Sequence, residues 1–193
     1  MGLVLHYLFI DSQEQLWIGL NSGLYCCLLG ETPQLIDSDC HVTYITELPQ
    51  SMAIGTTCDL RIYSKDRNLL QKLCPDTYVQ SLLPLPNKEI LLIGTFNCGV
   101  KSISLSSWQE QPVKNGSLPH TPIRSMIEMT PSTVLLGFDG DGVYTYNLSS
   151  GEAEPLFTRT NRMLTAMGVY SLCRDCEDNI WIGTYTGGAF LMM

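Results

Sequence analysis

Short apolar runs alternate with polar turns along the whole chain, and one apolar string that ends in glycine occurs five times. The five copies are Trp17-Ile18-Gly19, Ala53-Ile54-Gly55, Leu92-Ile93-Gly94, Leu135-Leu136-Gly137 and Trp181-Ile182-Gly183. The glycines at 19, 55, 94, 137 and 183 are therefore 36, 39, 43 and 46 residues apart. Self-similarity at a period near 40 residues indicates a repeat architecture in which each unit is one supersecondary element.

The same order of runs and turns is found in each unit. A first apolar run, such as 5–10 or 169–174, precedes a polar turn and the glycine-ending string, and a turn of small residues then leads to a third run. A weaker fourth run closes the first four units, as at 69–73 and 153–157. The runs are short, rich in Val, Ile, Tyr and Thr, and bounded by Gly, Asn, Asp and Pro, which is typical of β-strands rather than helices.

Four antiparallel strands of about five residues with tight turns need roughly 40 residues, the length of one β-propeller blade. We predict an all-β fold, a single β-propeller region over 1–193 with about five four-stranded blades, the last incomplete. The expected blades are 4–40, 41–77, 78–120, 121–166 and 167–193. Because the last unit lacks a fourth strand, we expect an open arc of a larger, seven-bladed propeller. A complete five-bladed ring with a strained closure is the alternative.

The string itself predicts how neighbouring blades pack. Blades taper toward the propeller axis, so a side chain at the end of the second strand would crowd its neighbour, and glycine removes that side chain. The large residue two places earlier, Trp17 or Trp181, is expected to fill the space between adjacent blades.

Two units resemble a known repeat. Residues 11–24 and 175–189 each contain an Asp, a short turn, a Leu/Ile-Trp-Ile-Gly string and a turn with glycine. They are similar to the two-component regulator propeller repeat, whose pattern is Asp, a short turn, Leu/Ile-Trp-Ile-Gly-Thr and then Gly-Gly-Leu. The middle units place Ala53, Leu92 and Leu135 where that pattern has Trp, and unit one has one of the paired glycines.

The resemblance implies a function. Repeats of this family build the periplasmic sensor region of hybrid two-component regulators, often in gut bacteria that degrade polysaccharides. It implies a ligand-sensing propeller fragment for signal transduction, with glycan fragments as ligands, homodimerisation through the parent protein, and a membrane span and a histidine kinase outside this chain.

Composition narrows the classes of partner. The net charge is −8, with 11 Lys and Arg against 19 Asp and Glu and no basic run, which argues against nucleic acid and anionic membranes. Hydrophobic residues make up 45%, as in a folded chain. No apolar stretch approaches the ~18 residues of a membrane-spanning helix. Residues 1–10 lack a basic segment, so we interpret them as a strand and not as a signal peptide.

No catalytic or metal motif emerges. Cys173 and Cys176 form a lone C-x-x-C pair, whereas a zinc site needs four ligands. The segment 139–142, Asp-Gly-Asp-Gly, resembles the start of a calcium loop, but its twelfth position is Ser150, so a hairpin turn is the better interpretation. We therefore expect no enzyme activity, no cofactor and no metal.

The starts of the first strands carry the candidate ligand-binding residues. Their first and fourth positions are always apolar, and the second can always form hydrogen bonds but differs in each unit. The first strand is innermost in a propeller, so these residues are expected around the central channel, with residues of the turn after the glycine at the same mouth. The strand candidates are His6, Thr43, Gln80, Arg124 and Tyr170, and the turn candidates are Asn21, Thr57, Asn97, Asp139 and Tyr185.

Such a ring of varied donors, acceptors and aromatic groups suits a polar ligand such as an oligosaccharide. The alternative is that the side chains only hydrate a water-filled channel. The leading hypothesis is a sensor or binding module. A protein-interaction scaffold without a small-molecule ligand is the second, and a lyase or hydrolase is the third, because the ring has no paired carboxylate.

Overall fold

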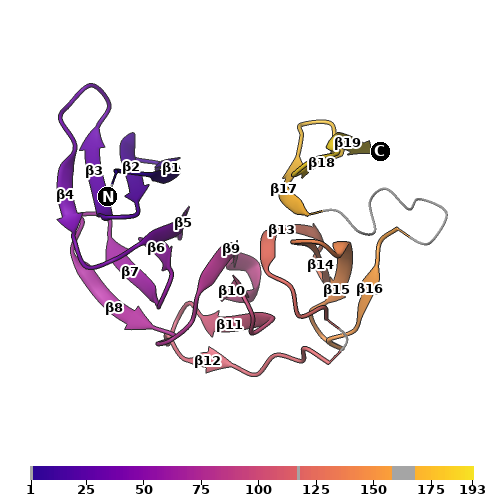
Figure 1. The fold of residues 1–193 in the computed structure, drawn as a ribbon. Coiled ribbons are helices and arrows are strands. Elements are labelled where there is room, and N and C mark those ends of the chain that lie inside the picture. Colours follow the sequence, from indigo (N-terminus) through magenta and orange to yellow (C-terminus); the bar gives the residue numbers. More distant parts are fainter. Residues whose placement is uncertain (1, 117, 158–167) are drawn as a thin grey trace.

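The computed structural model describes residues 2–116, 118–157 and 168–193, which form five antiparallel sheets set side by side in an open arc (Figure 1). The first sheet contains β1 (Leu5–Ile10), β2 (Gln15–Leu20), β3 (Gly23–Leu28) and β4 (Gln34–Asp37). The second contains β5 (Val42–Glu47), β6 (Ser51–Thr56), β7 (Leu60–Ser64) and β8 (Leu69–Leu73). The third contains β9 (Val79–Leu85), β10 (Ile90–Thr95), β11 (Val100–Ser104) and β12 (Glu110–Gln111), with the 3-10 turn η1 (Pro86–Lys88) after β9.

The fourth sheet contains β13 (Ile123–Thr130), β14 (Thr133–Phe138), β15 (Gly142–Asn147) and β16 (Ala153–Pro155), and the fifth contains β17 (Val169–Arg174), β18 (Ile180–Thr184) and β19 (Gly188–Met192). Within each sheet every strand pairs with the next one in sequence. The first strands β1, β5, β9, β13 and β17 contact one another in succession along the inner side of the arc (Figure 1). The predicted all-β propeller fold, with four-stranded blades and three strands in the last, is confirmed.

The repeated aspartate organises each hairpin that carries the full signature. Asp11 accepts hydrogen bonds from two backbone N–H groups of the following turn through Oδ1 and from Trp17 Nε1 through Oδ2, at 2.9 Å. Asp175 makes the same set of contacts, again with 2.9 Å to Trp181 Nε1. The spacing of six residues between Asp and Trp therefore closes the turn and fixes the indole.

Glycine in the second strand of each of the first four sheets lets the next sheet approach, as the sequence predicts. A Cβ at Gly55 would lie 2.5 Å from Cγ1 of Val79, the first residue of β9. A Cβ at Gly137 would lie 2.7 Å from Cγ1 of Val169, the first residue of β17. Both distances are far below van der Waals contact, so the seam between sheets closes only around a bare backbone.

Replacing Gly55 by alanine is expected to lower the free energy of unfolding by about 1–3 kcal/mol, because the new methyl group overpacks the seam against Val79. Urea unfolding will measure this as a lower midpoint with an unchanged slope. The matched control is Gly116→Ala, where an added Cβ meets nothing within 4 Å. Equal midpoints for both variants would contradict the packing role.

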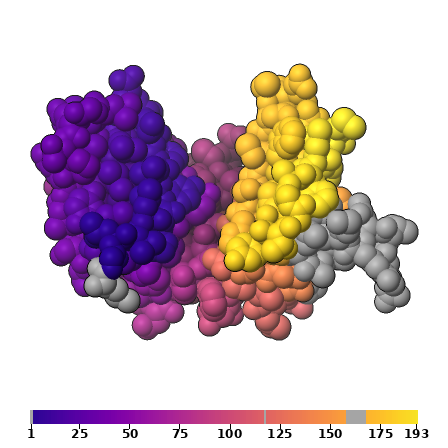
Figure 2. Space-filling model, turned by 45° about the horizontal axis from the view of Figure 1, so that its top comes forward, coloured from indigo at the N-terminus to yellow at the C-terminus, as the bar shows by residue number. Residues whose placement is uncertain are grey.

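The signature tryptophans differ in their surroundings. Trp17 is completely buried and belongs to a cluster with Val42, Ile45 and Tyr63 of the second sheet, so it fills the space between adjacent sheets as predicted. Trp181 is 43% exposed, because no further sheet covers that face of the fifth sheet among the described residues. Figure 2 shows the first and last sheets standing apart, with a hollow between them.

Buried charged groups join the first two sheets. Arg61 on β7 has a side chain only 3% exposed and donates to Asp59 at 3.0 Å and to Asp37, at the end of β4, at 2.6 Å. Its Nη2 also donates to the carbonyl of Asp39, and Tyr63 donates its hydroxyl to Asp37. Burial alone would raise the pKa of Asp37, but these hydrogen bonds and the Arg61 charge hold that pKa below its usual value.

No helix within residues 2–116, 118–157 and 168–193 has the length and apolar character needed to cross a membrane.

Candidate ligand-binding site

A β-bulge occurs at the second residue of every first strand. In the first sheet Leu5 pairs with Leu20 and Tyr7 with Gly19, so that His6 has no partner on β2. The same shift leaves one residue out of the ladder in each of the other sheets: Thr43, Gln80, Arg124 and Tyr170. A bulged residue is released from the regular alternation of the strand and can be aimed differently from its neighbours.

These five bulged residues line a single cavity of about 280 Å³ on the inner side of the arc, which we call the central cavity. The structure therefore brings together all five strand candidates. Three tyrosines complete the lining: Tyr7, Tyr44 and Tyr78. The volume is close to the lower end of the range for small-molecule sites, about 300 Å³, and suits a small ligand or the terminal unit of a larger one.

The Arg124 guanidinium of the central cavity links three sheets. Its Nη1 donates to Gln80 Oε1 at 2.6 Å, and its Nε and Nη2 donate to Asp139 Oδ2 at 3.1 and 2.7 Å. Its Cζ lies 4.9 Å from the centre of the Tyr170 ring, a cation–π contact. Arg124 is thus held by a carboxylate, an amide and an aromatic face.

Aromatic pairs form the apolar part of the wall. The ring centres of Tyr7 and Tyr44 are 4.5 Å apart, and Tyr170 stacks on Tyr185 with centres 5.3 Å apart. Burial and, after it, the neighbouring Tyr44 raise the pKa of Tyr7, so its phenol keeps its proton at neutral pH. The wall therefore combines ring faces with hydroxyl groups.

Two histidines meet at the first seam of the cavity. The Nε2 atoms of His6 and His41 are 2.9 Å apart, a distance at which one imidazole donates and the other accepts. Burial and, after it, the neighbouring His6 lower the pKa of His41. A hydrogen bond between the two Nε2 atoms requires a neutral acceptor ring, so the pair cannot carry two charges in this arrangement.

The turn candidates divide into two groups. Asp139 binds Arg124, and Tyr185, which is 73% exposed, stacks on Tyr170, so both contact residues of the central cavity. The other three, Asn21, Thr57 and Asn97, contact no residue of its lining in this way. The Asn21 side chain binds the backbone of residues 2 and 4, and the backbone N–H of Thr57 donates to the His41 carbonyl. Asn97 is an exposed turn residue next to Cys98. Local bonding within the turns places these three.

Sequence reasoning missed the lining tyrosines. Tyr7 and Tyr44 occupy the third position of their strands, where the later units have serine. Two of those serines bond across the seams instead: Ser81 donates to the Ile123 carbonyl at 2.7 Å, and Ser125 accepts from a backbone N–H of β17. The change from tyrosine to serine at this position is the signal that could have revealed the aromatic side of the cavity.

The other motifs are accounted for locally. Residues 139–142 connect β14 to β15, and their carboxylates accept hydrogen bonds from Arg124 and from the hydroxyl of Thr121. Cys173 and Cys176 are exposed free thiols. The described part of the chain holds no group of three or more His, Cys, Asp and Glu side chains placed to bind a metal ion.

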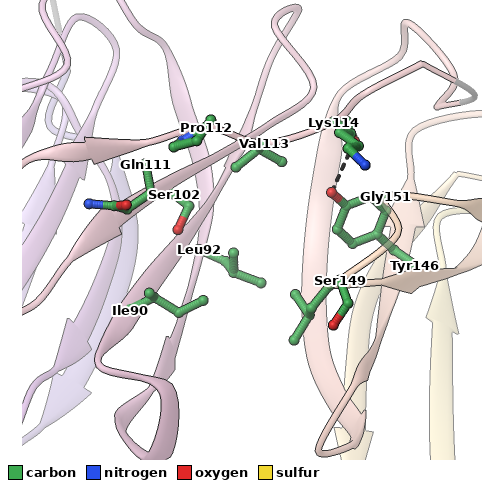
Figure 3. A pocket seen from close by; sticks show the side chains of 11 residues that line it. Ile90, Leu92, Ser102, Gln111, Pro112, Val113, Lys114, Tyr146, Ser149 and Gly151 are labelled. Atoms are coloured by element: carbon green, nitrogen blue, oxygen red, sulfur yellow. Dashed lines mark hydrogen bonds between the residues drawn. The ribbon is translucent and has the colours of Figure 1, made fainter.

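A second cavity, of about 240 Å³, lies between the third and fourth sheets (Figure 3). Leu92 and Val113 face it from one side and Tyr146 from the other. The Tyr146 hydroxyl already donates to the Lys114 carbonyl at 2.9 Å (Figure 3), and the apolar walls belong to the core cluster of that seam. The central cavity, with its varied polar groups, is therefore the candidate site.

Comparisons with known proteins place the fold. No protein-family model matches the sequence, and no curated protein matches it. The structure is similar to the extracellular domain of the hybrid two component system BT4673 from B. thetaiotaomicron, with a TM-score of 0.78 and 19% identity over 94% of this chain and 26% of that one. The extracellular domain of BT3049 from the same organism gives 0.76 and 17%, over 98% of this chain and 28% of that one.

A computationally designed protein, Ika8, is also similar, with a TM-score of 0.68 and 15% identity over 97% of this chain and 57% of that one. At these identities the likeness shows a common fold. The chain spans about a quarter of the length of the two B. thetaiotaomicron structures. Those two neighbours are extracellular domains of two-component systems and not catalytic domains.

Proposed function

We propose that this chain is the ligand-binding part of an extracytoplasmic sensor propeller in a hybrid two-component regulator, and that its central cavity binds a glycan fragment. The observation that carries the proposal is the convergence of five bulged residues, one from each sheet, on one cavity. The fold shared with extracellular domains of two-component systems supports the sensing role and a periplasmic location.

The lining has the chemistry that a sugar requires. The tyrosines of the lining can offer ring surface to the C–H face of a pyranose ring, and their hydroxyls can bond to ring substituents. Gln80 uses its carbonyl oxygen for Arg124, so its amide donors are the part that a ligand hydroxyl can use. A ligand of many hydroxyls and no charge matches this mixture.

Signalling would follow from where the ligand lies. Gln80, Arg124 and Tyr170 belong to three successive sheets, so one bound molecule contacts two seams at once. A ligand shifts a conformational equilibrium only by its difference in affinity between the two states. We expect the bound state to favour one packing of the sheets, and a homodimer of the parent protein to transmit that change across the membrane.

Replacing Tyr170 by alanine tests the site. We expect at least about a tenfold loss of affinity for neutral oligosaccharides, because the variant removes part of the cavity wall and the aromatic contact that holds Arg124 in place. Isothermal titration calorimetry against a panel of neutral oligosaccharides measures the change. Leu69→Ala is the control, since Leu69 lies on the outer strand β8 and is 44% exposed, against 43% for Tyr170.

An unchanged affinity in Tyr170→Ala would mean that the oligosaccharide does not bind in the central cavity. If no oligosaccharide of the panel binds and peptides are captured at the same face, the result favours a protein-interaction scaffold over a glycan sensor.

A further inference from the structure

We propose that the central cavity selects neutral glycan units over anionic ones, such as uronates, and that Asp139 is the residue that sets this preference. The inference rests on the proposed function and adds the charge of the ligand to it. The observation behind it is that the one permanently charged side chain in the described lining, Arg124, already has its counter-charge within the protein.

The charges at the site cancel. Arg124 Nη2 and Asp139 Oδ2 are 2.7 Å apart, and their side chains are 27% and 29% exposed. A pair that is partly withdrawn from water is screened less by salt than a fully exposed one. The remaining groups in the lining are tyrosines, an amide, a hydroxyl and one imidazole.

The hydrogen-bond capacity of Arg124 points to the same ligand class. A guanidinium has five N–H donors. Three are engaged, two by Asp139 and one by Gln80, which leaves two for a ligand. The Tyr170 ring holds the guanidinium plane from one side. Arg124 thus presents donors of fixed direction to a hydroxyl or ring oxygen without an unbalanced charge.

A carboxylate ligand would meet an unfavourable arrangement. To pair with Arg124 it must either displace Asp139 or lie beside it, and two carboxylates at one site repel each other. Discrimination of this kind comes from an element that disfavours the wrong partner. Asp139 supplies that element from the turn after β14, although the side chain is not itself part of the cavity lining.

The test compares two oligosaccharides that differ only at C6 of one ring, a hydroxymethyl group in one and a carboxylate in the other. Calorimetry at pH 7.5 and low salt should show the wild type binding the neutral form at least about tenfold more tightly. In Asp139→Asn, which keeps an acceptor for Arg124 but removes the charge, the ratio of the two affinities should fall by at least about tenfold. In this variant added salt should restore part of the ratio, because it screens the attraction between Arg124 and the carboxylate form.

The outcomes separate the two proposals. Equal or tighter binding of the carboxylate form by the wild type, or an unchanged ratio in Asp139→Asn, overturns the charge preference and leaves the glycan site intact. If neither sugar binds the wild type, glycan binding fails, and inorganic sulfate at low millimolar concentration then tests the charge balance alone.

The sulfate test compares the thermal unfolding midpoint of each protein with and without sulfate. Asp139→Asn should be stabilised by sulfate more than the wild type, and the double variant Arg124→Gln/Asp139→Asn should lose the extra stabilisation. Equal responses of all three proteins overturn the inference. Circular dichroism spectra of the variants show whether each one is folded.

Discussion

Replacing Trp17 by alanine will lower the free energy of unfolding by about 3–5 kcal/mol, the largest packing effect expected in this chain. The indole is completely buried between the first and second sheets, against Val42 and Ile45. Its loss leaves a cavity in the seam and also leaves the buried Asp11 carboxylate without its indole donor. Urea unfolding will show the change as a lower midpoint.

The chain contains its own control for this experiment. Trp181 makes the same hydrogen bond to Asp175 and occupies the same position in its repeat, but it is 43% exposed. Trp181→Ala should therefore cost less than half as much as Trp17→Ala, because less apolar surface returns to water. Equal losses would mean that the hydrogen bond to aspartate, and not burial in a seam, accounts for the stability of this signature.

Replacing Arg61 by leucine will destabilise the chain by a similar amount, about 3–5 kcal/mol, because it leaves two shielded carboxylates without their cation. The side chains of Asp37 and Asp59 are 16% and 14% exposed, so water compensates only in part. Thermal or urea unfolding measures the loss. Lys72→Leu is the control, since Lys72 and Asp39 form an exposed pair at 3.9 Å, whose removal should change stability by at most about 0.5 kcal/mol.

The same cluster makes stability depend on pH in a defined direction. The pKa of Asp37 is lower in the folded chain than its usual value, so its ionised form stabilises the fold. That contribution is complete above the pKa of the unfolded chain, about 3.9, and disappears as the pH falls through the lower folded pKa. The stability difference between wild type and Asp37→Asn should be full at pH 7 and shrink below about pH 4. A constant difference would exclude ionisation of Asp37 as its source.

The repeat period was sufficient to predict the fold because it reflects contacts that recur in every unit. The repeat glycine of each of the first four sheets lies against the first residue of the next sheet, as Gly55 lies against Val79. Since the same close approach is required at four seams, its residue types stand out even in a single sequence. The Arg61 cluster had no such signal, because it joins Asp37, Asp59 and Asp39 in one seam only.

The candidate site was predicted only in part. Aligning the strand starts identified His6, Gln80 and Arg124 as neighbours, since equivalent positions of equivalent strands must face the same axis. The bulge that releases these residues from the ladder was not predictable, because no glycine or other special residue marks it. The partner of Arg124 also depends on where the turn after β14 places Asp139, which the spacing of the repeat does not determine.

The bulges have a consequence for protein engineering. A residue that takes no part in strand pairing can be exchanged without disturbing the register, so the scaffold and the recognition surface are encoded by separate sets of positions. A combinatorial library varied at such positions would explore new specificities while keeping the glycine and tryptophan framework. The chain is therefore a natural template for the directed evolution of receptors with chosen ligand specificities.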